Sequence, residues 1–132
     1  MPNSSLASNP DAIVYFTGVD LSEKEGYLYK YDATYGLAIN DSATVPAAGV
    51  VLSGAPAVQQ SSIAFLGATA GTYRLKSSGT IKRWQHVQQD TAGTVTVNAG
   101  SGARTLVGIA DENAVSGDLF RCALISPIVI AS

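Results

Sequence analysis

The chain has 132 residues, the size of one domain, and a formal net charge of -2. Hydrophobic residues make up 46% of the sequence and charged residues only 14%. Small and uncharged polar residues must therefore cover much of the surface, as in a protein that packs against neighbours. No basic block is present, which argues against a nucleic-acid-binding protein, because such proteins need a Lys and Arg patch to displace counterions.

The cysteine content and the hydropathy indicate the cellular compartment in which the protein is made. A single cysteine, Cys122, excludes an internal disulfide, so the fold does not depend on an oxidising environment. No apolar run approaches the roughly 18 residues that a membrane span needs. The first residues also lack the basic and apolar regions of a signal peptide. We therefore expect a soluble protein that is made in the cytoplasm and has no membrane partner.

The start of the chain differs from the rest. Residues 1–11 are mostly Ser, Asn, Pro and Ala without periodicity, which predicts a flexible N-terminal arm, followed by a single β domain over residues 12–132. The arm is either a terminus of no consequence or a segment that orders on a partner. In the second case the candidate binding residues are Asn3, Ser4, Ser5, Leu6 and Ala7.

Short alternating or apolar runs are separated by turn residues roughly every ten residues. The expected strands cover residues 12–16, 26–31, 35–39, 50–52, 61–66, 72–76, 80–88 and 94–98. The last third, residues 104–130, adds two strands joined by a short polar connector. The sequence thus predicts an all-β sandwich or small barrel of about nine or ten short strands, with at most single helical turns at 46–49 and 110–115.

Aromatic residues give the main candidates for a contact surface. Residues 26–40 are expected to form a β-hairpin in which Tyr27, Tyr29 and Tyr31 share one face. These rings either pack across the strands or form an exposed stripe at an oligomer or partner interface, where tyrosine is enriched. Trp84 is either a half-buried packing residue or, with the tyrosines, part of an interface or a platform that stacks on a sugar.

A weak internal echo links residues 36–52 to residues 108–120. Both segments contain a strand, a connector of small residues, a glycine and a second strand. The echo indicates either a duplicated β-unit or two similar turns.

The residue types needed for catalysis or metal binding do not form a pattern. His86 is the one histidine, and no GxSxG motif accompanies it. One histidine and one cysteine do not make a zinc site, and no phosphate-binding glycine motif occurs. The adjacent Asp111 and Glu112 could bind Ca²⁺ or form a solvated turn, and Cys122 lies in an apolar alternation that favours burial. We expect no catalytic residue, no metal and no cofactor, and hence no enzyme.

Residues 105–124, TLVGIADENAVSGDLFRCAL, resemble the C-terminal part of small phage head decoration (capsid cement) proteins. In that family a strand ending in a V-G-I/V-A sequence leads into an Ala-rich connector. A Gly-Asp or Gly-Glu step then begins a strand. The matching residues here are 106–110, 113–118 and 119–124.

The resemblance implies a structural virion protein on the capsid exterior. Such proteins form β-rich units, often trimers, that sit over junctions between capsid subunits and stabilise the expanded shell. An N-terminal arm commonly adds to capsid β-structure through backbone hydrogen bonds, and many copies make weak contacts strong. The implied partners are the major capsid protein and further copies of the chain, with a homotrimer favoured. The alternatives are a carbohydrate-binding β-sandwich that uses Trp84 and the tyrosines, and a tail or fibre domain.

Overall fold

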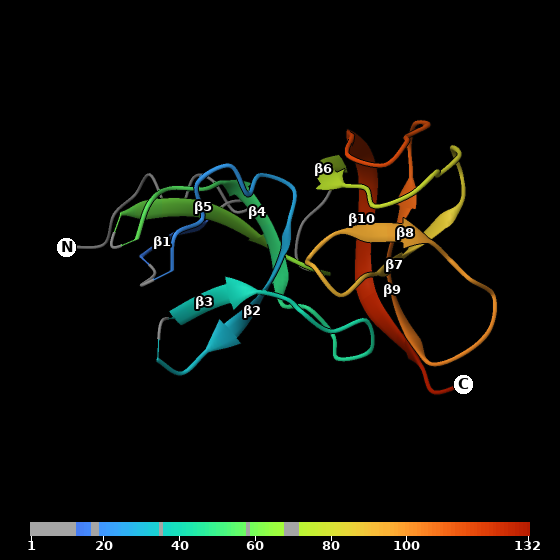
Figure 1. Cartoon of the computed structure of the whole chain (residues 1–132), viewed down its shortest axis with the longest axis horizontal. Helices are drawn as coiled ribbons and strands as arrows, with labels where there is room; N and C mark the ends of the chain where they lie inside the picture. The colour runs from blue at the N-terminus through green and yellow to red at the C-terminus, as the bar shows by residue number, and fades with distance from the viewer. Residues whose placement is uncertain (1–12, 17–18, 35, 58, 68–71) are drawn as a thin grey trace.

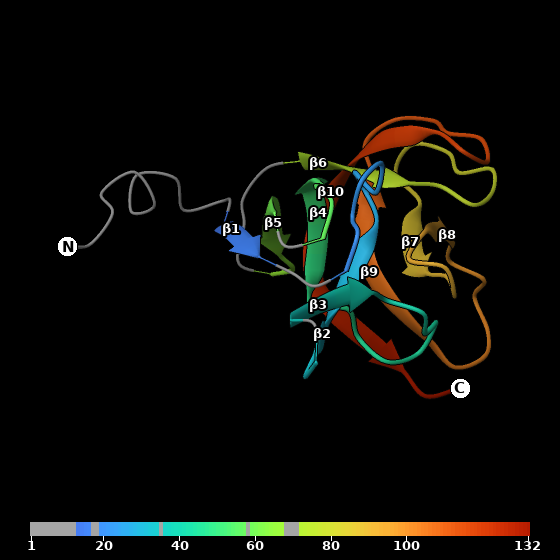
Figure 2. The same ribbon diagram turned by 60° about the vertical axis from the view of Figure 1, so that its left-hand side comes forward.

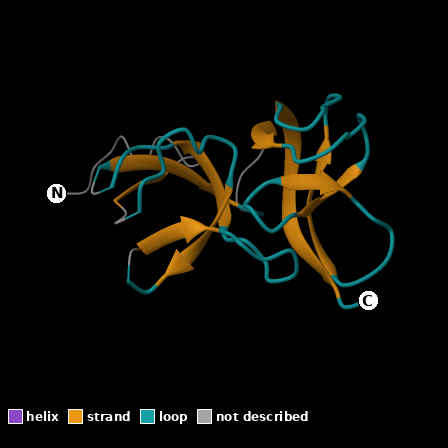
Figure 3. Ribbon diagram, viewed as in Figure 1, coloured by secondary structure: helices purple, strands orange, loops and turns teal. Residues whose placement is uncertain are grey.

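The computed structural model describes residues 13–16, 19–34, 36–57, 59–67 and 72–132. This part of the chain contains ten strands and no helix (Figure 3). The strands are β1 (Ile13–Phe16), β2 (Leu28–Asp32), β3 (Gly36–Ile39), β4 (Gly49–Ser53), β5 (Gln60–Phe65), β6 (Thr72–Lys76), β7 (His86–Gln89), β8 (Val95–Val97), β9 (Arg104–Ala110) and β10 (Leu119–Ile130). The all-β prediction is confirmed, including the number of strands.

The strands form two antiparallel sheets of five. Residues 13–65 form the first unit, with the strand order β1-β5-β4-β2-β3, and residues 72–130 form the second unit, with the order β6-β10-β9-β7-β8. The two units lie side by side, with β1 and the C-terminus on opposite sides of the molecule (Figure 1). In both views β1 and β5 lie on the side of the first unit that faces away from β7 and β8 (Figures 1 and 2).

The two units have the same topology. Adding five to each strand number of the first sheet gives the strand order of the second, and all neighbouring strands pair antiparallel in both. The correspondence extends to single residues. The equivalent cross-strand pairs of the two hairpins are Tyr29–Ile39 and Val87–Val97, Lys30–Ala38 and Gln88–Thr96, and Tyr31–Leu37 and Gln89–Val95. The chain is therefore an internal duplication.

Hydrogen bonds outside the strands repeat in the same way. The Asn40 amide donates to the Leu28 carbonyl at 2.9 Å, and the Asn98 amide donates to the His86 carbonyl at 2.8 Å. The loops contain equivalent backbone hydrogen bonds too. The bond between Leu21 and Ala55 corresponds to the bond between Ile81 and Ala114. The bond between Gly26 and Val51 corresponds to the bond between Trp84 and Ala110. Equivalent turns thus hold equivalent strands in both units.

Glycine occupies the same place in β4 and β9. A Cβ at Gly49 would overlap the carbonyl oxygen of Ala64, and a Cβ at Gly108 would lie 2.7 Å from the carbonyl oxygen of Ala123. Duplication was one of two interpretations of the sequence echo, but the aligned segments were wrong. Gly108 corresponds to Gly49, not to Gly36, because each pairs with the equivalent residue of its neighbouring strand. The sequence could not show this, since the pattern of strand, small-residue turn and glycine recurs too often to fix the register.

Burial explains how the units join. Strand neighbours point to opposite faces, so the first sheet has two apolar faces. One face forms a cluster within the first unit: Leu21, Tyr29, Leu37, Val51 and Ile63. The other contributes Leu28, Ala47, Val50 and Ala64 to a larger cluster with the second unit, whose members include Leu75, Val87, Val95, Phe120 and Cys122. The second sheet thus buries its inner face on the outer face of the first.

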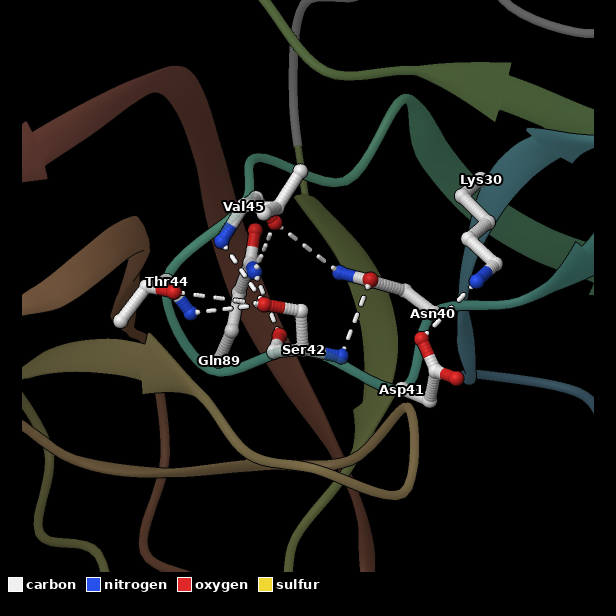
Figure 4. Close-up of polar contacts among 7 residues, drawn as sticks. All are labelled: Lys30, Asn40, Asp41, Ser42, Thr44, Val45 and Gln89. Atoms are coloured by element: carbon white, nitrogen blue, oxygen red, sulfur yellow. Dashed lines mark hydrogen bonds and ion pairs between the residues drawn. The ribbon is translucent and has the colours of Figure 1, made fainter.

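A buried polar side chain completes this contact. Gln89 of β7 has no exposed surface, and its amide reaches the loop between β3 and β4 (Figure 4). Its Oε1 accepts from the Ala47 amide at 2.7 Å, and its Nε2 donates to the carbonyls of Ser42 and Val45 at 2.9 and 2.8 Å. Asn40, also buried, orders the same loop by accepting from the Ser42 amide at 3.3 Å.

Three sequence predictions differ from the structure. The strand expected over 80–88 is confined to 86–89, because the backbone turns at Trp84, where φ is +77°. Ile81 makes only an isolated bridge to Ala114. The windows 46–49 and 110–115 hold no helical turn. Instead Gly49 begins β4, and the Ala114 bridge keeps the second window extended.

Gln89→Ala is expected to lower the free energy of unfolding by about 3 kcal/mol, because it leaves the buried Ala47 amide and the Ser42 carbonyl without their Gln89 partner. The Val45 carbonyl keeps only the 3.5 Å bond from the Asn40 side chain. Urea denaturation monitored by circular dichroism measures this difference. The control is Gln88→Ala, which removes one hydrogen bond, to the Ala99 amide at 2.8 Å, from a half-buried residue. Its expected cost is about 1 kcal/mol or less. Equal losses in the two variants would show that the Gln89 contact does not hold the units together.

Candidate functional site

The structure separates the three tyrosines of the predicted stripe. Tyr29 is fully buried, so an exposed stripe that includes it is wrong; its ring fills the core of the first unit. Tyr31 is 57% exposed, with its ring 6.3 Å edge-to-face from Tyr29 and 6.5 Å from Phe65. Tyr27 is half-buried beneath Lys24, whose Nζ lies 4.7 Å above the ring. The arm candidates, Asn3, Ser4, Ser5, Leu6 and Ala7, lie outside the described residues.

Trp84 is the most exposed large apolar side chain among the described residues, with 68% of its surface accessible. Its φ of +77° is a left-handed backbone conformation, which costs an ordinary residue roughly 1–2 kcal/mol. The equivalent residue of the first unit is Gly26, with φ of +84°. The Gly26 amide donates to the Val51 carbonyl of β4, and the Trp84 amide donates to the Ala110 carbonyl of β9, both at 2.8 Å. The turn therefore requires the left-handed conformation in both units, and only the second unit has a large side chain at this position.

Charged residues surround this indole. The guanidinium of Arg83 lies 4.5 Å over the Trp84 ring and 3.5 Å from the Asp111 carboxylate. Arg121 lies 3.9 Å from Asp111 and 3.5 Å from Glu112. The acidic pair is therefore ion-paired with two arginines. In the described part of the chain no group of three or more His, Cys, Asp or Glu side chains is placed to hold a metal ion.

A cavity of about 250 Å³ lies beside these charges, between the loop that carries Trp84 and the connector between β9 and β10. Its lining is Thr80, Ile81, Lys82, Asn113, Ala114, Val115 and Asp118. Ile81 and Ala114 are buried, whereas Val115 is 57% exposed. We call Trp84, Arg83 and the residues that line this cavity the Trp84 corner. The sequence did not predict this cavity. The one sign of it was Val115, an isolated valine within a polar connector.

The two other candidate residues for chemistry, Cys122 and His86, have different surroundings. Cys122 is fully buried in the shared core, and this burial raises the pKa of its thiol to about 12. The prediction of a buried structural cysteine is confirmed, because a neutral thiol in a core is a poor nucleophile. His86 is exposed at the start of β7.

No family model and no curated protein matches the sequence. Among solved structures, the chain is similar to the N base of the head fibre protein gp8.5 of bacteriophage phi29. The TM-score is 0.62, the identity is 11%, and the likeness covers 86% of this chain and 92% of that chain. The two proteins thus share a fold. None of the described residues forms a helix long and apolar enough to cross a membrane.

Trp84→Gly is expected to be more stable than Trp84→Ala by about 1 kcal/mol, because glycine adopts the left-handed turn without steric cost. At Lys82, which does not have a positive φ, the order should reverse, with alanine more stable than glycine by about 0.5–1 kcal/mol. Urea denaturation monitored by circular dichroism gives all four values. An alanine advantage at both positions would contradict the assignment of strain to Trp84.

The Cys122 thiol is expected to resist an aromatic disulfide reagent at pH 8 in the native protein and to react at once in urea. Its folded pKa of about 12 lies above the ordinary value of 9.0, so the unfolded chain loses this proton first. Its contribution to stability is therefore present below pH 9 and is lost as the pH rises toward 12. The Cys122→Ala variant should lack this loss when unfolding is measured against pH. Rapid labelling of the native protein would contradict the burial.

Proposed function

We propose that this chain is a non-enzymatic structural protein of a phage head. The observation that carries the proposal is the shared fold with a phage head fibre base, which extends over most of both chains. Topology alone does not fix function, but here a second observation agrees with it. The segment that resembles phage decoration proteins, residues 105–124, forms the end of β9, the connector and the start of β10.

In its finer form, the proposal places the protein on the outside of the capsid. It binds the major capsid protein, stabilises the expanded shell and acts as a homo-oligomer, with a trimer favoured. The arm supplies one contact through Asn3, Ser4, Ser5, Leu6 and Ala7. The exposed rings of Tyr31 and Trp84 supply surface for others. Residues 3–7 carry no charge, and the arginines near Trp84 are paired with carboxylates, as suits contact with a protein shell.

Two alternatives remain as competing functions. A fibre domain is supported by the likeness to the phi29 protein, which is the base of a head fibre. A carbohydrate-binding module is supported by the exposure of Trp84. Against the second, Arg83 lies over the Trp84 ring, and Tyr29 is buried. A row of free rings, which a stacking platform needs, is therefore incomplete among the described residues.

Purified chain is expected to co-sediment with expanded capsids of the phage that carries it and to raise their resistance to heat. A variant that lacks residues 1–11 should bind at least about tenfold more weakly, which corresponds to a loss of 1.4 kcal/mol. Electron microscopy of labelled virions separates a head position from a tail position, and sedimentation velocity gives the number of copies. Absence of binding to both capsids and tails would overturn the proposal.

A further inference from the structure

The duplication allows each residue of the second unit to be compared with its counterpart in the first. Both positions of a pair have the same backbone surroundings, so residues that serve the fold should recur. Several do: Asp32 and Asp90, Asn40 and Asn98, Gly49 and Gly108, Ala55 and Ala114, and Ala64 and Ala123. A cluster of differences therefore marks a place where one unit has a role that the other lacks.

Such a cluster lies at the Trp84 corner. The second unit carries large or charged residues where the first unit has small or apolar ones. The corresponding pairs are Gly26 and Trp84, Leu52 and Asp111, Ser53 and Glu112, Gly54 and Asn113, and Ser62 and Arg121. These changes supply three of the four members of the charge network, and the fourth is Arg83.

One of these differences, Gly54 and Asn113, lies at the cavity. In the first unit the Leu21 carbonyl comes so close to Gly54 that a Cβ there would overlap it. In the second unit the equivalent of Gly54 is Asn113, whose Oδ1 accepts from the Arg83 amide at 2.9 Å. The Asn113 side chain thus adds a link between two loops that also touch through the backbone bonds of Ile81 and Ala114, and residues of both loops line the cavity.

The corner also lies where a contact between units is expected. In the first unit, Gly26 is buried by the second unit, and its carbonyl accepts from the Lys76 amide at 3.0 Å. A Cβ at Gly26 would lie 2.5 Å from Leu119 and 3.1 Å from the Lys76 amide nitrogen. The indole of Trp84 is far larger than a Cβ. It therefore prevents another copy of the unit from docking in the same way and leaves the corner to a different partner.

The chemistry of the corner identifies the class of partner. Ile81 and Ala114 form an apolar floor, and Trp84 and Val115 are exposed beside it. Arg83 and Arg121 are paired with Asp111 and Glu112. Lys82 is the one cation in the lining of the cavity, and the Asp118 carboxylate in the same lining disfavours an anion.

Two of the polar groups at the cavity are also engaged. The Asn113 oxygen holds the Arg83 amide, and the Asp118 carboxylate accepts from the Val115 amide at 2.9 Å. A sugar needs such groups free. The volume, about 250 Å³, is below the roughly 300–1,000 Å³ of small-molecule pockets and suits one side chain.

We propose that the Trp84 corner binds a partner protein by taking one apolar side chain into the cavity against Val115, while the exposed Trp84 ring outside the cavity adds contact surface. Exposed Trp and Arg around a pocket are the residue types that dominate binding energy at protein interfaces. The identity of the partner as a capsid subunit rests on the proposed function. The site itself does not.

The site is tested first without any capsid. Isotope-labelled chain is titrated with N-acetyl-leucinamide, with N-acetylglycinamide as the matched probe that lacks a side chain, and with N-acetylglucosamine. The leucine probe should shift the resonances of Ala114, Val115 and the Trp84 indole at millimolar concentration, and the glycine probe should not. Shifts caused by the sugar alone would overturn the proposal in favour of a glycan site. An absence of shifts with all three probes would also overturn it.

Capsid binding provides the second test. Val115→Asp should weaken co-sedimentation at least about tenfold, because it places a charge in an apolar contact. The control is Val45→Asp, a valine that is 63% exposed in a loop of the first unit, and it should bind within about twofold of the unmodified chain. Equal binding by both variants would overturn the site. If the unmodified chain binds no capsid, the proposed function fails, and the titration still decides the site.

Discussion

The burial of the second sheet's inner face on the first sheet's outer face is the contact on which the rest of the molecule depends. Each unit alone spans too few residues to bury a substantial share of its apolar surface. Stacking solves this problem, because Leu28, Val50 and Ala64 enter the core of the second unit. Buried polar side chains also cross this contact: all three side-chain hydrogen bonds of Gln89 go to the first unit, and the Thr105 hydroxyl donates to the Thr44 carbonyl there. Apolar burial supplies the stability, and the amide fixes the position at which the units meet.

Because the sheets stack in this manner, equivalent residues of the two units have different surroundings. Leu28 faces the shared core, whereas its counterpart His86 is exposed. Leu52 packs against that core, and its counterpart Asp111 faces two arginines. The outer side of the second unit is therefore polar where the same side of the first is apolar. In stacked repeats a polar outer face of this kind ends the stack and keeps the chain soluble.

Alternation of residue types predicted most of the fold, because strands that are half-buried must alternate. It placed β6 at its observed bounds and the β2–β3 hairpin at its observed turn. It failed at residues 80–88, because alternation says nothing about a left-handed turn at Trp84. It also could not separate Tyr29 from Tyr31. Both point to one face, and only the edge of the packed cluster decides which ring is covered.

The duplication and the cavity were harder to predict, for a common reason. Matching strands carry few identical residues, since a sheet asks only for apolar side chains of suitable size. The loops between them differ in length, so no constant shift aligns the whole sequence. Residues that meet at the Trp84 corner come from two loops about thirty positions apart, as with Arg83 and Asn113. Their proximity follows from the pairing of β7, β9 and β10, which the sequence does not encode locally.

The backbone at Trp84 shows how fold and function divide this corner. The first unit has glycine at the same turn with nearly the same φ, so the left-handed conformation belongs to the fold and not to the indole. A glycine would satisfy the turn without steric cost. A tryptophan there adds strain of roughly 1–2 kcal/mol, and its ring recovers little through burial because 68% of it is exposed. Stability alone therefore does not account for the residue. Strain of this type collects at binding sites, which leaves contact with a partner as the role that explains it.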